Sequence, residues 1–208
     1  MTTRTLTRRA ALAAVTVTAA LVLSACGDDG AGHDGHTAAR HGASASAASH
    51  NAQDVAFAQG MVPHHRQAVE MARLAADRAS SARVKDLATR IEKAQDPEIR
   101  TLSGWLDAWG EQAPGAGMDH SGHAGMPGMP GAAGMMSDGD MAALKKATGK
   151  RFDTAFLSLM VEHHRGAVEM ARTERDKGAY GPAKRMADGI VTAQNAEIKT
   201  MNQLLGSG

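Results

Sequence analysis

Two segments of the sequence carry paired histidines flanked by methionines, and these side chains are ligands for metal ions. The segments 61–73 and 160–172 share the pattern Met-Val-x-His-His-Arg-x-Ala-Val-Glu-Met-Ala-Arg and lie 99 residues apart. Imidazole nitrogen and thioether sulfur together suit a borderline to soft metal, so copper in either oxidation state is the first candidate. The alternative, in which histidine and methionine only fill a helical core, explains one histidine more easily than a pattern that occurs twice.

The spacing of the first motif predicts one face of an α-helix. At about 100° per residue, one stripe contains both histidines, and the charged residues Arg66, Glu70 and Arg73 fall on the opposite side. We therefore expect the histidines to point into the protein. The stripe consists of Phe57, Met61, His64, His65, Ala68 and Ala72, with Met71 at its edge.

The repeat extends well beyond the histidine motif. Residues 54–106 match residues 153–205 at 24 of 53 positions, which indicates an internal duplication. A buried carboxylate without a partner is unfavourable by several kcal/mol, and Glu98 interrupts the apolar stripe of the predicted second helix. We therefore expect Glu98 to orient an imidazole or to bind the metal. The residues predicted to lie behind the metal ligands, or to join them, are Gln95, Glu98, Gln194 and Glu197.

Helix signals predict the fold class. The expected helices span about 51–79, 82–109, 138–147, 150–177 and 182–205. Strand signals are absent, since aromatic residues are scarce and no apolar–polar alternation persists. The prediction is an all-α four-helix bundle built from two duplicated helical hairpins, 51–109 and 138–208, with a long crossover linker over 110–137. Pro63 and Pro97 are expected to disturb their helices.

Residues 1–25 resemble the signal peptide of a bacterial lipoprotein. Three arginines precede an apolar run too short to span a bilayer comfortably, and the pair Arg8-Arg9 leaves Sec and twin-arginine export both open. The run ends at Leu23-Ser24-Ala25-Cys26, so we expect lipid at Cys26 and anchoring to the outer face of the bacterial cell membrane. Cys26 is the only cysteine, which excludes a disulfide framework within one chain. Without the signal, 20 basic side chains stand against 22 acidic ones, and no nucleic-acid partner is indicated.

Two segments of low aliphatic content carry further histidines and methionines. Residues 26–50 predict a disordered tether whose histidines either capture divalent copper or zinc loosely or are incidental. Residues 110–137 predict a flexible linker that gathers monovalent copper, the alternative being a linker with methionine by chance. The flexible capture candidates are His33, His36, His41, His50, Met118, His120, His123, Met126, Met129, Met135 and Met136.

The motif Phe57-x-x-x-Met61-Val62-Pro63-His64-His65 and its second copy resemble the domain of unknown function 305 family over about residues 54–205. The resemblance implies an exported, ferritin-like four-helix bundle that binds copper in resistance or homeostasis. Glu162 stands where the usual motif has proline, so the second site departs from the family pattern. Carried over by position, the implied metal-site residues are Met61, His64, His65, Met71, Met160, His163, His164 and Met170.

These observations leave three functions from different classes. The first is a lipid-anchored copper-binding protein that sequesters or relays copper through Met and His ligands without turnover, its delivery partner unknown. The second is a ferritin-like metal oxidase or oxidoreductase, which needs Glu-x-x-His motifs that the predicted helices lack. The third is a structural stress lipoprotein without metal. We favour the first, because the histidine and methionine pattern is present in both copies.

Overall fold

The computed structural model describes residues 49–112 and 133–206. Within these ranges the chain is helical, and the five helices follow the predicted boundaries closely: α1 Ala52–Arg78, α2 Ala82–Trp109, α3 Asp138–Lys146, α4 Gly149–Lys177 and α5 Gly181–Gly206. None of these helices is long and apolar enough to cross a membrane. The predicted signal peptide, the lipid site and most flexible capture candidates lie outside the described residues, namely Cys26, His33, His36, His41, Met118, His120, His123, Met126 and Met129.

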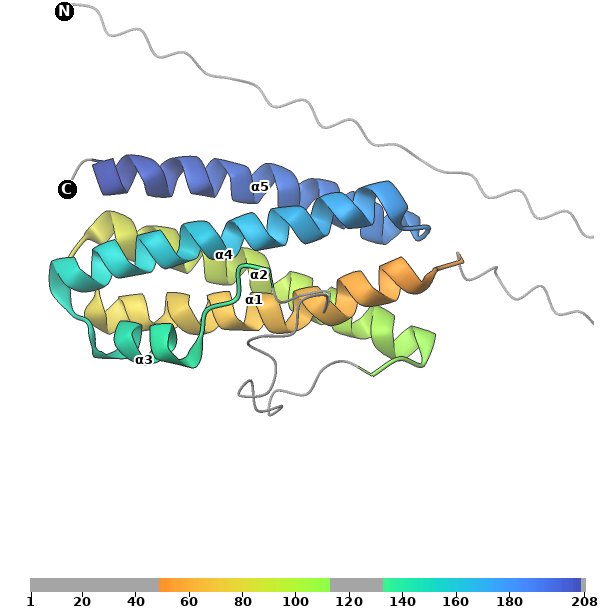
Figure 1. Cartoon of the computed structure of the whole chain (residues 1–208), viewed down its shortest axis with the longest axis horizontal. Helices are drawn as coiled ribbons and strands as arrows, with labels where there is room; N and C mark the ends of the chain where they lie inside the picture. The colour runs from red at the N-terminus through yellow and green to blue at the C-terminus, as the bar shows by residue number, and fades with distance from the viewer. Residues whose placement is uncertain (1–48, 113–132, 207–208) are drawn as a thin grey trace, which may run out of the picture. The chain divides into compact units, whose positions relative to one another are not determined.

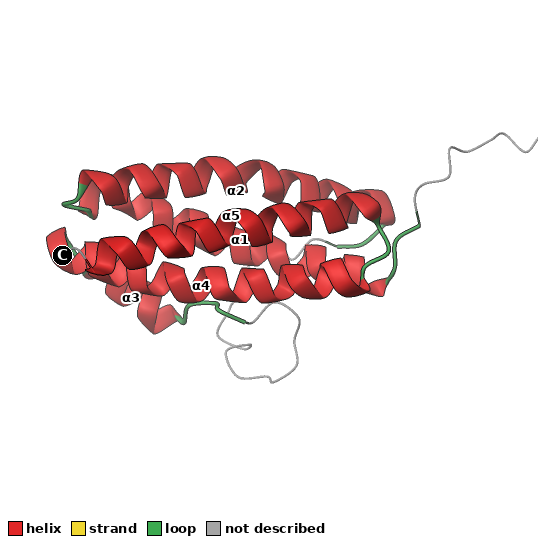
Figure 2. Ribbon diagram, turned by 90° about the horizontal axis from the view of Figure 1, so that it is seen from above, coloured by secondary structure: helices red, strands yellow, loops and turns green. Residues whose placement is uncertain are grey.

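The four long helices form the predicted bundle. Helices α1 and α2 make one hairpin, α4 and α5 make the other, and α1 packs directly against α4. Figures 1 and 2 show the long helices side by side, with the short helix α3 alongside. Helix α3 contacts both α1 and α4, so it lies over the junction of the two hairpins.

Local capping explains where the helices begin. The Asn51 side chain accepts hydrogen bonds from the backbone N–H groups of Gln53 and Asp54, and Asp54 accepts from the N–H of Asn51 in return. Ser137 and Asp140 form the same reciprocal box at the start of α3. Pro63 and Pro97, which were expected to disturb their helices, lie inside α1 and α2, and neither proline ends its helix. Each proline removes one backbone donor, and the packed faces on either side hold the helix together.

Two aspartates at equivalent repeat positions lock the hairpins to each other. Asp54 accepts hydrogen bonds from the backbone N–H groups of Ala179 and Tyr180 in the α4–α5 turn. Asp153 accepts from the N–H groups of Ser80 and Ser81 in the α1–α2 turn. Each copy therefore caps the turn of the other copy, and this exchange fixes α1 and α4 in antiparallel register.

A buried carboxyl group adjoins one of these caps. Glu174 is fully buried, whereas the equivalent residue in the first copy is Ala75. Burial, followed by the neighbouring carboxyl group of Asp54, raises the pKa of Glu174 to about 8. Burial also acts to raise the pKa of Asp54, but the neighbouring Glu174 carboxyl group and backbone hydrogen bonds outweigh it and lower that pKa. The raised pKa favours the protonated form of Glu174 beside the ionised Asp54.

This pair predicts that the protein loses stability as pH rises from mildly acidic values to about 8. Because the pKa of Glu174 is raised in the folded state, its stabilising contribution is complete below its ordinary pKa and is lost as pH rises through about 8. We expect the free energy of unfolding to fall as pH rises from about 4.5 to about 8, and Glu174→Gln to remove much of that fall. Urea unfolding followed by helical circular dichroism measures both. Equal pH slopes for the two proteins would contradict the assignment.

Candidate metal centre

Four histidines meet where α1 crosses α4. The side chains of His64, His65, His163 and His164 are all 0% exposed, which confirms that the paired histidines point inward. The rings of His64 and His163 face each other across the junction, with centroids 3.7 Å apart and planes inclined by 39°. On the opposite side of α1, Glu70 and Arg73 are exposed, as the helical periodicity predicts.

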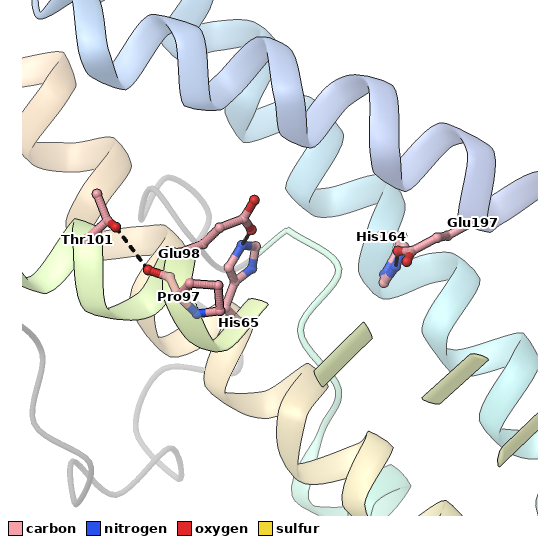
Figure 3. Close-up of polar contacts among 6 residues, drawn as sticks. All are labelled: His65, Pro97, Glu98, Thr101, His164 and Glu197. Carbon is pink, nitrogen blue, oxygen red and sulfur yellow. Dashed lines mark hydrogen bonds and ion pairs between the residues drawn. The ribbon is translucent and has the colours of Figure 1, made fainter. Parts of the chain in front are cut away.

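A glutamate from the partner helix of each hairpin holds one imidazole. The Nε2 atom of His65 lies 2.8 Å from Oε2 of Glu98, and Nε2 of His164 lies 2.8 Å from Oε2 of Glu197. Figure 3 shows the two pairs, one on each hairpin. Glu98 was expected to orient an imidazole or to bind the metal; here it contacts the imidazole of His65, and Glu197 repeats the contact in the second copy. In both copies a threonine one turn further on donates its hydroxyl to the carbonyl of Pro97 or Ala196.

These contacts decide which imidazole nitrogen remains free. A carboxylate only accepts hydrogen bonds, so His65 and His164 carry their protons on Nε2 and leave a lone pair on Nδ1. The Nε2 of His64 likewise donates to the carbonyl oxygen of Ala133, at 3.2 Å. The Nδ1 atoms of all four histidines are buried and have no hydrogen-bond partner among the described residues, and neither has Nε2 of His163.

Burial keeps the facing pair of imidazoles neutral. Desolvation, followed by the charge of His65 and His164, lowers the pKa of His64 to about 3. Desolvation, followed by His64 and the other two histidines, lowers the pKa of His163 well below its ordinary value. Neutral imidazoles present lone pairs, as metal ligands must.

The four motif methionines fall into two clusters, and each cluster contains one methionine from each copy. Met71 and Met160 belong to one buried cluster, while Met61 belongs to the other, against which the half-buried Met170 packs. The antiparallel crossing explains this arrangement, because Met71 follows His64 whereas Met160 precedes His163. Each side of the histidine junction thus has one thioether from each copy. In the sequence each copy is a separate set of candidate ligands, whereas in the structure each cluster draws its methionines from both copies.

Gln95 on α2 and Gln194 on α5 are buried amides, and each precedes by three residues the glutamate that contacts a histidine. Both side chains are 3% exposed, and the Oε1 atom of each has no hydrogen-bond partner among the described residues. In the described parts of the chain, no three His, Cys, Asp or Glu side chains are grouped as a metal site. The donors that the structure offers near this junction are imidazole nitrogens and thioether sulfurs. The unpartnered nitrogens and the buried methionines fit a soft ion with few ligands.

A short segment before α3, which we call the strap (Ala133–Met136), closes the junction from outside. The Gln67 side chain donates to the carbonyl of Met136 at 3.0 Å and accepts from its N–H at 2.8 Å. The strap passes so close to α4 that a Cβ on Gly166 would lie 2.0 Å from the carbonyl oxygen of Ala133. Gly134 adopts φ +76°, a conformation that glycine tolerates.

The structure corrects two parts of the sequence interpretation. Met135 and Met136, assigned above to a flexible capture tract, are half-buried and belong to the strap, which Gln67 holds through the Met136 backbone. His50, assigned to the disordered tether, stacks on Trp109 with ring centroids 4.4 Å apart. Sequence reasoning missed Gln67 and Gly166. The sequence did mark them, because Gln67 and Gly166 occupy equivalent positions, one of only two at which the motifs 61–73 and 160–172 differ.

Comparison with known proteins follows the same residues. The family model "Domain of unknown function (DUF305)" matches residues 54–205. A DUF305 crystal structure from Streptomyces coelicolor is 35% identical, with a TM-score of 0.65, and the match covers 74% of this chain and 93% of that one. A DUF305 fragment from Deinococcus radiodurans is 33% identical, with a TM-score of 0.65 and coverage of 76% and 98%. No curated protein matches the chain.

Solved structures of a protein called CopM are also similar. CopM in the Cu(I)-bound form is 29% identical to this chain, with a TM-score of 0.59, and the match covers 74% of this chain and 96% of CopM. CopM in the Cu(II)-bound form is 32% identical, with a TM-score of 0.63 and the same coverage.

The fit between the strap and α4 predicts the effect of one methyl group. Gly166→Ala places a Cβ where the Ala133 carbonyl lies, so we expect the strap to detach while the bundle stays helical. Faster hydrogen exchange at the Met136 amide, which is bonded to Gln67, would report the detachment.

Gly189→Ala in α5 is the matched control, because nothing lies within 4 Å of a Cβ at that site. This control should stabilise the helix by about 1 kcal/mol and leave the Met136 amide protected. Unchanged exchange in Gly166→Ala would show that the strap does not depend on this contact.

Proposed function

The chain belongs to the DUF305 family, and from this premise we propose that it is an exported copper-binding protein that sequesters or relays copper. The observation that carries the proposal is the junction of four buried histidines whose Nδ1 atoms have no partner among the described residues. Such atoms are unfavourable in a protein interior unless a ligand satisfies them. A bound ion supplies that ligand.

Copper is the ion that suits the donors best. Imidazole nitrogen accommodates both oxidation states, and thioether sulfur favours Cu(I). The similar protein CopM has been solved in Cu(I)-, Cu(II)- and Ag-bound forms, and Ag(I) is also a soft monovalent ion. Glu98 and Glu197 increase the basicity of His65 and His164 by accepting their Nε2 protons, as carboxylates behind metal-bound histidines commonly do.

The proposed pathway begins outside the bundle. The histidines and methionines of residues 26–49 and 113–132 capture copper, and the buried junction retains it. The protein is exported and held at the outer face of the membrane through lipid on Cys26. The Streptomyces coelicolor relative carries the description of a secreted protein. We assign no turnover to the chain, because storage and relay require only binding and release.

A dimetal oxidase is less consistent with the site. Such centres use several carboxylates that bridge two ions. Here Glu98 and Glu197 each contact a different histidine, and both remain partly exposed, at 27% and 20%. Oxygen consumption on addition of ferrous iron distinguishes the two functions.

Removal of the facing histidines should abolish the tightest copper binding. We expect His64→Ala with His163→Ala to lose Cu(I) to a competing chelator under anaerobic conditions, while circular dichroism still reports a helical bundle. His50→Ala is the control, since this exposed histidine lies outside the junction. Retention of Cu(I) by the double variant would exclude the junction as the tight site.

The carboxylates behind the histidines should tune affinity rather than create it. Combined Glu98→Ala and Glu197→Ala should weaken Cu(I) binding by about 10–100-fold, because His65 and His164 lose the groups that orient them. Glu92→Ala, which removes a surface pair with Arg73, is the matched control and should leave affinity unchanged. Equal affinity in all three proteins would show that the glutamates have only a structural role.

A further inference from the structure

Aromatic side chains gather at one end of the bundle. Trp105 and Trp109, the only tryptophans of the chain, lie with ring centroids 6.2 Å apart. The single tyrosine, Tyr180, meets them edge-on at 5.4 and 5.3 Å. His50 stacks on Trp109, with ring centroids 4.4 Å apart. We call these four residues the aromatic end.

The aromatic end combines three separate elements. His50 precedes α1, the tryptophans lie on the last turns of α2, and Tyr180 lies in the α4–α5 turn. Figure 1 shows the start of α1, the end of α2 and this turn at the same end of the bundle. Trp105, Trp109 and Tyr180 are half-buried and His50 is exposed, so the group packs inward on one side and meets solvent on the other.

The fold does not require aromatic residues at these positions. In the duplicated half, the equivalents of Trp105 and Tyr180 are Leu204 and Ser81, and those of Trp109 and His50 are both glycine. The opposite end of the bundle is built from the same repeat and closes without them. Packing alone therefore does not explain why one end concentrates all the Trp and Tyr of the chain.

The segment that carries the predicted lipid site joins the bundle at this end. Cys26 lies 23 residues before Ser49, and a chain of that length spans at most about 80 Å. Lipid on Cys26 would therefore keep the bundle close to the bilayer at a high effective concentration. The aromatic end is the part of the bundle to which the tether is attached.

We propose that the aromatic end is a membrane-docking surface that sets Trp105, Trp109 and Tyr180 in the headgroup region of the bilayer. Tryptophan and tyrosine prefer this region, because each combines an apolar ring with a polar N–H or O–H group. Exposed basic residues near Tyr180 (Lys177 and Arg185) are balanced by exposed acidic residues near the tryptophans (Asp107 and Glu111), so the aromatic rings rather than net charge carry the docking. The proposal rests on the lipid attachment proposed above and is independent of copper binding.

Tryptophan fluorescence tests the proposal directly, since both tryptophans of the chain belong to the aromatic end. The full lipidated protein is reconstituted into phosphatidylcholine and phosphatidylglycerol vesicles, with and without lipids brominated near the headgroup. We expect a blue shift of the emission and strong quenching by the brominated lipids. Emission that is neither shifted nor quenched in the vesicles would overturn the docking surface.

A matched variant moves the reporter to the other end of the bundle. In Trp105→Phe, Trp109→Phe, Leu204→Trp, the single tryptophan occupies the repeat equivalent of Trp105 near the end of α5. We expect no quenching in this variant, and equal quenching at both ends would overturn a specific docking surface. The wild-type measurement decides the question by itself if the variant does not fold.

Flotation of the vesicles separates this inference from the proposed function. Protein that floats with vesicles but keeps unquenched tryptophans is anchored without docking, which overturns the inference alone. Protein that does not float lacks the lipid anchor, which overturns both the anchor and the docking. Copper titration of the same sample reports the metal function independently of either result.

Discussion

The burial of neutral imidazoles between α1 and α4 is the constraint on which the rest of this structure depends. Water is excluded from His64 and His163, and each polar atom there needs another partner or remains unsatisfied. The surrounding elements supply only part of what is needed. Glu98 and Glu197 each accept one proton, and the strap carbonyl of Ala133 accepts a third. The Nδ1 atoms of the four histidines keep lone pairs without a partner among the described residues, and a soft metal ion can bind them.

The duplication supplies a symmetric frame for this junction. Asp54 and Asp153 each cap the turn of the opposite hairpin, so that neither copy is complete without the other. The same antiparallel arrangement places Met71 beside Met160 in one cluster and gives Met61 to the other. A copper centre on this frame belongs to the pair of hairpins, and a single hairpin contains only part of its ligands.

Departures from the repeat are where the two halves acquire separate roles. Gln67 binds the strap, while Gly166 leaves room for it. Glu174 stands at the position equivalent to Ala75 and introduces a buried carboxyl group of raised pKa next to the Asp54 cap. The aromatic end likewise has no counterpart in the other copy. Symmetric residues thus build the core and the metal junction, whereas asymmetric residues control how the junction is covered and how the bundle meets its surroundings.

The sequence by itself determined the helices, the inward direction of the histidines and the contact of Glu98 with an imidazole. These features follow from local periodicity and from folding one helix back on its neighbour, and the local sequence determines both. The tertiary structure alone decided that His64 faces His163, that each methionine cluster draws on both copies, and that residues 133–136 form a strap. These contacts join residues about 70 to 100 positions apart, and their geometry depends on how α1 crosses α4. Local patterns carry no information about that crossing, because many packings of two amphipathic hairpins bury the same faces.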